Sequence, residues 1–235
     1  MRALALLPGF DWVALAIFFV GWAGYVHFAR VRSATRPSIL AATNAVRRQW
    51  MLQSTYRDVR VVDGVVIQNL SSSPSFFAST TILIIGGLLA VLGASDRAGE
   101  LVRDIPFAAR TSALVFDLKL ILLLGIFVYA FFRFTWSMRQ YTFGALLVAS
   151  APEAEQFLAR GAEGEAARIT FADRAGSMVA MAAETFNDGL RAYYLSFAAM
   201  AWLFSPMAMV LATAGVVYIL YQREFRSDVL ELLSS

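Results

Sequence analysis

The chain has no cysteine, one histidine, one lysine and few charged residues. The absence of cysteine excludes disulfides, a thiolate nucleophile and cysteine-ligated iron–sulfur or zinc sites. Charged residues make up 16% of the chain, whereas a typical soluble domain carries about a quarter. Hydrophobic residues make up 59%, and the mean hydropathy is +0.61. This composition argues against an ordinary soluble protein of 235 residues.

Catalytic signatures are also lacking. The sequence contains no HExxH, no GxSxG, no phosphate-binding loop and no pair of aspartates in the middle of an apolar segment. The single histidine, His27, supplies one ligand where a b-type haem usually takes two. We therefore expect no enzymatic activity, no metal site and no cofactor.

Four long apolar segments dominate the sequence, and each approaches the ~20 residues that a helix needs to cross a ~30 Å hydrocarbon core. They predict an all-α fold, an integral membrane four-helix bundle that forms one polytopic domain over residues 1–235. Asp11 interrupts the first apolar run and no small-residue cleavage site follows it, so we expect that segment to be retained as an anchor. The predicted spans are residues 12–29, 75–93, 118–134 and 193–221.

Arginine is distributed unevenly between the predicted spans. Seven arginines lie between spans one and two and five between spans three and four, whereas the middle loop has three, offset by Asp96, Glu100 and Asp104. The positive-inside rule then places the first and third loops in the cytoplasm and both termini outside. We expect a bacterial inner membrane, with periplasmic termini. The pI of about 9.4 reflects contact with anionic lipid headgroups rather than nucleic acid.

Local signals predict shorter helices and helix ends. Apolar residues at three- and four-residue spacing from Ser38 to Trp50 predict a short amphipathic cytoplasmic helix, lying either on the membrane or on the protein's own cytoplasmic face. Ser71–Ser73 before Pro74 indicates that span two begins there. Ser150 and Glu153 form a capping-box pattern, with a helix ending near Gly161. Pro206 predicts a kink in the long fourth span.

Small residues recur along one side of the second span. Residues of this kind let membrane helices approach closely. We interpret them as a helix-packing face within the bundle, with an oligomer interface as the alternative. The face consists of Ser79, Gly86, Ala90 and Gly93.

Polar and aromatic residues gather at the predicted cytoplasmic ends of spans three and four. Arginine can hold a phosphate or carboxylate with two parallel hydrogen bonds, and tryptophan suits the membrane interface. These residues form a candidate binding pocket at the cytoplasmic leaflet; the alternative is an ordinary aromatic belt with arginines at the headgroups. The pocket comprises Trp136, Arg139, Gln140, Asn187, Asp188 and Arg191.

Four stretches resemble a bacterial membrane family catalogued as domain of unknown function 599. They are Phe76–Thr80, Phe134–Tyr141 (FTWSMRQY), Phe186–Tyr194 and Tyr221–Ser227 (YQREFRS). The resemblance covers nearly the whole chain and implies a four-span protein. It brings no established activity.

Two functions remain after these exclusions. The first is a non-catalytic accessory or interaction subunit that binds a protein partner or anionic lipid at its cytoplasmic face, alone or as a homo-oligomer. The alternative is a small oligomeric transporter or channel, favoured by Pro206 in an overlong span, because interrupted helices form many transport sites. The absence of an internal repeat in four spans argues against transport.

Overall fold

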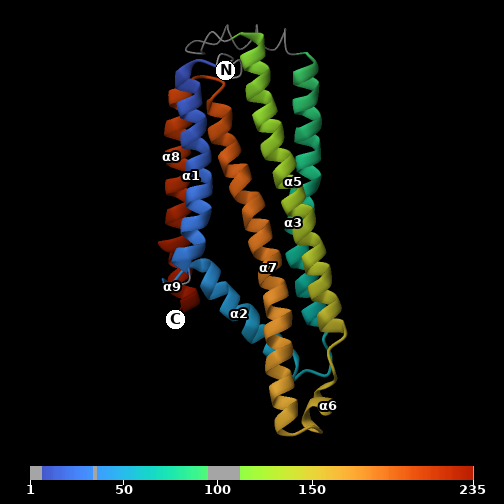
Figure 1. The fold of residues 1–235 in the computed structure, drawn as a ribbon. Coiled ribbons are helices and arrows are strands. Elements are labelled where there is room, and N and C mark those ends of the chain that lie inside the picture. Colours follow the sequence, from blue (N-terminus) through green and yellow to red (C-terminus); the bar gives the residue numbers. More distant parts are fainter. Residues whose placement is uncertain (1–6, 34–35, 95–111, 235) are drawn as a thin grey trace. The chain divides into compact units, whose positions relative to one another are not determined.

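The computed structural model describes residues 7–33, 36–94 and 112–234, and these residues form helices and turns without a strand. The all-α prediction is confirmed. The helices, as labelled in Figure 1, are α1 (Gly9–Ser33), α2 (Ile39–Ser54), α3 (Val61–Gly93), α5 (Ala113–Ala149), α6 (Ala154–Leu158), α7 (Ala162–Ala201), α8 (Pro206–Phe225) and α9 (Asp228–Ser234).

Three of these helices, α1, α3 and α5, are long and apolar enough to cross a membrane. That finding indicates a membrane protein. Judged by length and composition, α8 is not among these three, so the described helices do not confirm the predicted four spans.

The chain divides into two compact units, and α3, α5 and α7 contribute residues to both. Unit 1 contains residues 1–36, 80–131 and 190–227; unit 2 contains residues 37–79, 132–189 and 228–235. The single domain expected over residues 1–235 stays a prediction.

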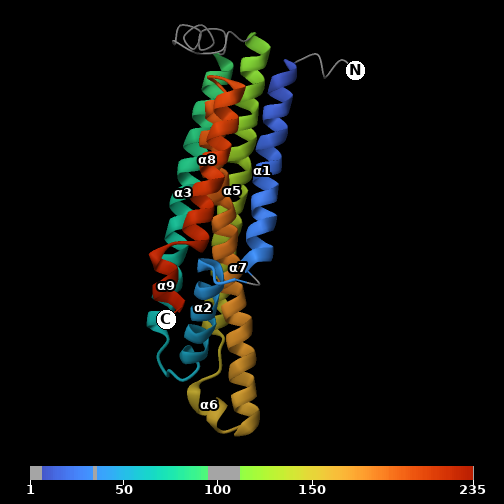
Figure 2. The same ribbon diagram turned by 90° about the vertical axis from the view of Figure 1, so that its left-hand side faces the viewer.

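In unit 1, α1 and α8 run side by side in the same direction (Figures 1 and 2). A Cβ atom built on Gly21 would lie 3.1 Å from the Thr213 side chain, and further along both helices the rings of Phe28 and Phe225 are 5.9 Å apart. Since residue numbers increase together along the contact, the C-terminal ends of α1 and α8 lie at the same end of unit 1. If α1 and α8 both cross a membrane, this pairing puts the beginning of α1 and the end of α8 on opposite sides of it.

The predicted single fourth span, residues 193–221, is wrong. Helix α7 ends at Ala201, a turn follows, and Pro206 begins the separate helix α8 instead of kinking a continuous one. Ser205 is the N-cap of α8, and its side chain accepts a hydrogen bond from the backbone N–H of Ala208. Proline suits the first helical turn because its missing N–H has no helical acceptor there.

The predicted start of span two at Ser71–Pro74 is also wrong. Helix α3 begins at Val61 and continues through Pro74 to Gly93. Proline removes one helical hydrogen bond, yet Pro74 is buried inside α3. The local serine–proline pattern therefore does not end the helix.

Unit 2 has an apolar core built by side chains from α2, α3, α5 and α7. Its fully buried members include Met51, Ala175, Val179 and Ala182. The helix predicted from Ser38 is present as α2, with the Ser38 side chain accepting from the N–H of Ala41. At the capping-box position Glu153, not Ser150, is the N-cap of α6, and its side chain makes no capping hydrogen bond.

The turn before α7 follows the glycine signal in the sequence. Gly161 has a positive φ of 54°. Glycine adopts this backbone conformation without steric strain, whereas residues with a Cβ atom rarely do. Helix α6 ends at Leu158 and α7 begins at Ala162, so the prediction of a helix end near Gly161 is confirmed.

Candidate functional site

Five of the six predicted pocket residues belong to unit 2. Trp136, Arg139 and Gln140 lie on α5, and Asn187 and Asp188 lie on α7. Arg191 follows on α7 but belongs to unit 1. The six-residue pocket as a whole therefore stays a prediction, and the two parts are described separately.

In unit 2, Asp188 forms an ion pair with Arg133, a residue outside the predicted pocket. The Asp188 side chain is 8% exposed and that of Arg133 29%, so most of the pair is removed from water. Replacing only one of these two residues by an uncharged residue would leave the other charge uncompensated in a largely buried place. The sequence did contain a signal, because Arg133 interrupts an apolar run, and charged residues in such runs usually have a specific partner.

Aromatic rings surround the same point of unit 2. Phe77 of α3, Phe134 of α5 and Phe186 of α7 have ring centroids 5.4 to 5.8 Å apart. A Cβ atom on Gly189 would lie 2.5 Å from the Phe134 ring, so only glycine allows α7 to approach this ring so closely. The Arg133–Asp188 pair is thus held beside a close helix–helix contact.

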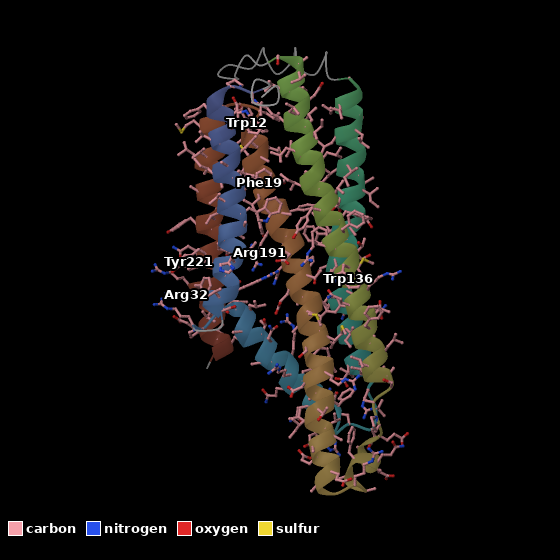
Figure 3. All side chains as sticks on the ribbon, in the orientation of Figure 1. Trp12, Phe19, Arg32, Trp136, Arg191 and Tyr221 are labelled. Atoms are coloured by element: carbon pink, nitrogen blue, oxygen red, sulfur yellow. The ribbon has the colours of Figure 1, made fainter. Side chains whose placement is uncertain are left out.

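The α5 residues of the predicted pocket face in different directions. Gln140 is buried, and its Oε1 atom has no hydrogen-bond partner among the described residues. Trp136 is 48% exposed and Arg139 is exposed; Figure 3 labels Trp136 on α5. The predicted site therefore separates into a buried amide and an outward-facing tryptophan and arginine.

In unit 1, the guanidinium of Arg191 lies 5.9 Å from the centre of the Tyr25 ring. This is within the ~6 Å reach of a cation–π interaction. Nearby on α7, the hydroxyl of Tyr194 accepts a hydrogen bond from Arg223 of α8 at 2.5 Å. Two arginines of unit 1 thus contact tyrosines of neighbouring helices; Arg191 is labelled in Figure 3.

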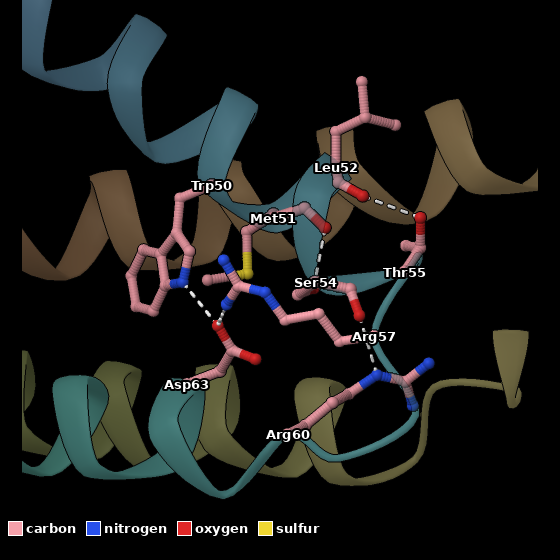
Figure 4. A network of polar contacts seen from close by, with 8 residues as sticks. All are labelled: Trp50, Met51, Leu52, Ser54, Thr55, Arg57, Arg60 and Asp63. Carbon is pink, nitrogen blue, oxygen red and sulfur yellow. Dashed lines mark hydrogen bonds and ion pairs between the residues drawn. The ribbon is translucent and has the colours of Figure 1, made fainter.

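A second polar cluster in unit 2 is centred on the fully buried carboxylate of Asp63, shown in Figure 4. Its Oδ1 atom accepts from the indole N–H of Trp50 at 2.7 Å and from Arg57 at 2.5 Å. This contact favours the alternative in which α2 packs on the protein itself, since Trp50 binds a side chain of α3. Arg60 donates to the carbonyl of Ser54 at 2.9 Å in the same view.

Arg168 is the most buried arginine side chain among the described residues, with 2% exposure. It donates to the carbonyls of Thr55 and Ala154, and its guanidinium lies 4.2 Å and 4.7 Å from the ring centres of Tyr56 and Phe157. The Tyr56 hydroxyl donates to Glu165, which raises the pKa of that tyrosine. Arg168, one of the five arginines between predicted spans three and four, is therefore a structural brace within unit 2.

At the other end of unit 1, Asp11 accepts a 2.6 Å hydrogen bond from the indole of Trp202. Lys119 is 1% exposed; its Nζ atom lies 5.4 Å from the centre of the Trp202 ring and has no hydrogen-bond partner among the described residues. The buried indole therefore fixes the turn between α7 and α8 to the beginning of α1. Among the described residues, no group of three histidines or acidic side chains could hold a metal ion.

The predicted helix-packing face does not pack against other described residues. Ser79, Gly86, Ala90 and Gly93 are all exposed, and no described atom comes within 4 Å of a Cβ built on either glycine. The described residues give no support to the interpretation as an internal packing face, which stays a prediction. The oligomer alternative stays a prediction.

The class that this architecture defines is a helical protein with three helices capable of spanning a membrane. A family described as "Protein of unknown function, DUF599" matches residues 13–229. The chain belongs to this family, as its sequence resemblance indicated. No curated protein and no solved structure matches it.

Proposed function

We propose that the protein is a non-catalytic multi-pass protein of the bacterial inner membrane that docks a partner membrane protein. The docking surface is the outer face of α5, defined here as Phe132, Trp136, Arg139, Phe143 and Leu146. Their spacing of four, three, four and three residues places them on one side of a helix. All five are exposed.

The exposure of this face is the observation that carries the proposal. Phe132 is 64% exposed, Trp136 48%, Phe143 40% and Leu146 61%. A contiguous exposed apolar patch commonly marks an interaction site, and tryptophan and arginine are the residues most often found to dominate the energy of interfaces. Arg139, at the centre of the face, suits a partner that presents a carboxylate.

The position along α5 of the far end of this face favours a protein partner over lipid. Leu146 lies twelve residues beyond Phe134, the end of the third predicted span, which is about 18 Å along a helix. The headgroup region adds only ~5–8 Å on each side of the hydrocarbon core. An apolar side chain so far beyond the span gains little from lipid. Anionic lipid remains a contact for residues nearer the span.

The parallel pairing of α1 and α8 suggests a revised orientation. The arginine asymmetry places the C-terminal end of α1 in the cytoplasm, so the C-terminal end of α8 belongs there too. Arg223 and Arg226 lie at that end of α8 and add to the cytoplasmic positive charge. The N-terminus is then periplasmic and the C-terminus cytoplasmic.

The alternative of a small oligomeric transporter or channel loses the feature that favoured it. That feature was Pro206 as an interruption within one long span. Pro206 instead begins a separate helix with its own N-cap, which is an ordinary helix start.

A photo-crosslinking amino acid at position 136, in protein extracted with mild detergent, tests the proposal. We expect a stoichiometric protein partner to crosslink there. In co-purification without the crosslinker, Trp136→Ala and Arg139→Glu should each weaken recovery of that partner by about tenfold or more, as loss of a central interface residue does. Arg139→Lys separates bidentate binding from simple charge attraction.

The matched control is Leu158→Ala, because Leu158 is 71% exposed and lies on α6, away from the α5 sequence. It should leave recovery unchanged. If the partner identified by crosslinking co-purifies equally with the Trp136→Ala, Arg139→Glu and Leu158→Ala proteins, or if no protein crosslinks at position 136, the proposed docking face is refuted.

A further inference from the structure

Unit 1 contains a second candidate site, a cleft of about 670 Å³ between α1 and α5. Phe19, Trp22 and Arg30 line it from α1, and Ile121, Gly125 and Tyr129 line it from α5. Figure 3 labels Phe19 on α1. Both helices are among the three that could span a membrane, so the cleft would open sideways into lipid.

The chemistry of the lining changes along the cleft. Most of the lining is apolar and includes Phe19 of α1 and Ile121 of α5. Trp22 of one wall and Tyr129 of the other make an edge-to-face contact, with their ring centroids 5.6 Å apart. At the C-terminal end of α1 the lining becomes His27 and Arg30. None of the described lining residues is acidic. The cleft is therefore an apolar slot with a basic end.

We propose that this cleft binds a phospholipid with an anionic headgroup: the acyl chain lies between α1 and α5, and the phosphate meets Arg30 and His27. An arginine fork matches phosphate oxygens with two parallel hydrogen bonds. The basic end coincides with the cytoplasmic end of α1 in the proposed orientation, where anionic headgroups are available. The site is separate from the α5 outer face and does not depend on it.

The dimensions of the cleft are those of a small-ligand site. From Phe19 to Arg30 it extends about 16 Å along α1. Its volume of about 670 Å³ falls in the range of ~300–1,000 Å³ that small-ligand sites occupy.

Quenching of tryptophan fluorescence by brominated phosphatidylglycerol measures binding in the full-length protein reconstituted in phosphatidylcholine nanodiscs. Trp22 lies in the cleft, so the difference between wild-type and Trp22→Phe protein isolates its signal. We expect brominated phosphatidylglycerol to quench Trp22 at about tenfold lower mole fraction than brominated phosphatidylcholine. That factor corresponds to one charge-assisted hydrogen bond.

Two pairs of variants test the two ends of the cleft. Arg30→Gln should abolish the preference for phosphatidylglycerol, whereas Arg32→Gln, which removes a neighbouring arginine that does not line the cleft, should keep it. Gly125→Leu should fill the cleft and prevent quenching by either lipid, and Gly215→Leu should not. A Cβ atom meets nothing within 4 Å at either glycine, so both proteins should fold.

The size-exclusion profile and the thermal midpoint of each variant show whether it folds. Equal quenching by the two lipids in wild-type protein would refute the headgroup assignment. A phosphatidylglycerol preference that survives Arg30→Gln, or quenching that survives Gly125→Leu in folded protein, would refute the site. Stronger Trp22 quenching by a neutral brominated isoprenoid than by phosphatidylglycerol would assign the cleft to a neutral lipid and overturn the proposal.

Discussion

Replacing Arg168 by leucine should destabilise unit 2 more than the loss of any exposed arginine. Leucine approximates the aliphatic stem but cannot donate hydrogen bonds. The Arg168 side chain is 2% exposed, and it donates to the backbone carbonyls of Thr55 and Ala154 and to the Thr55 hydroxyl. After the substitution both carbonyls lose this donor in a place that water does not reach easily.

The magnitude follows from these contacts. Each buried carbonyl left without a partner costs about 1–3 kcal/mol, and the guanidinium also loses its stacking on Tyr56 and Phe157. The ion pair with Glu165 adds little, because its atoms are 3.8 Å apart and the glutamate is 55% exposed. We expect a loss of about 3–5 kcal/mol in the free energy of unfolding. That corresponds to a fall in Tm on the order of 10 °C for a protein of this size.

Thermal unfolding in mild detergent, followed by circular dichroism, measures the change. Arg174→Leu is the matched control, because Arg174 lies on the same helix and is exposed; its effect should stay within about 0.5 kcal/mol. Arg168→Lys should fall between the two, since lysine keeps the charge but loses the planar fork. If Arg168→Leu and Arg174→Leu unfold at the same temperature, the assignment of Arg168 as a structural brace is refuted.

Two further predictions concern orientation and helix packing. Because the chain has no cysteine, single cysteines report topology: one at Ala98 should react with an impermeant thiol reagent from outside, and ones at Ala162 and Arg226 should not. Labelling at both Ala98 and Arg226, but not at Ala162, would restore the orientation with both termini outside. Gly189→Leu should cost about 1–3 kcal/mol, measured by thermal unfolding, because its Cβ would collide with Phe134. Gly86→Leu, with open space around it, should leave the stability of the monomer unchanged, and an equal loss in both variants would contradict the packing described for α3.

The all-α class and the first helix could be predicted well from the sequence, because both depend on the length and periodicity of apolar segments, which are local properties. The sequence predicted residues 12–29 for a helix that covers Gly9–Ser33, and Ser38 as the start of a helix that begins at Ile39. Both signals depend on residues within one or two turns of the helix end, which is why they could be read without tertiary information.

The two serine–proline pairs show where local reasoning fails. Ser73-Pro74 was interpreted as a helix start and lies inside α3, whereas Ser205-Pro206 was interpreted as a kink and begins α8. The local pattern is the same. What differs is the surroundings: the indole of Trp202 binds Asp11, 191 residues away, and no pattern in the sequence indicates that contact.

The candidate site could be predicted only in part, for a similar reason. Helical spacing identified Asp188 as a polar residue at a span end, but depth alone did not indicate its ion pair with Arg133. Equal depth does not determine which side of a helix a residue faces. Arg139 lies six residues, and therefore well over one turn, beyond Arg133 on α5, and it is exposed.

Unit 2 is assembled from three stretches of chain, 37–79, 132–189 and 228–235, separated by the stretches that form unit 1. Helix α9, at the end of the chain, packs on α2, near its beginning. During synthesis α2 must therefore wait for nearly the entire polypeptide before its last neighbour emerges from the ribosome. Until then its apolar side is open to chaperones, to the membrane surface and to other chains. Truncation near residue 227 would prolong this exposure indefinitely, so a few missing C-terminal residues would affect a helix made long before them.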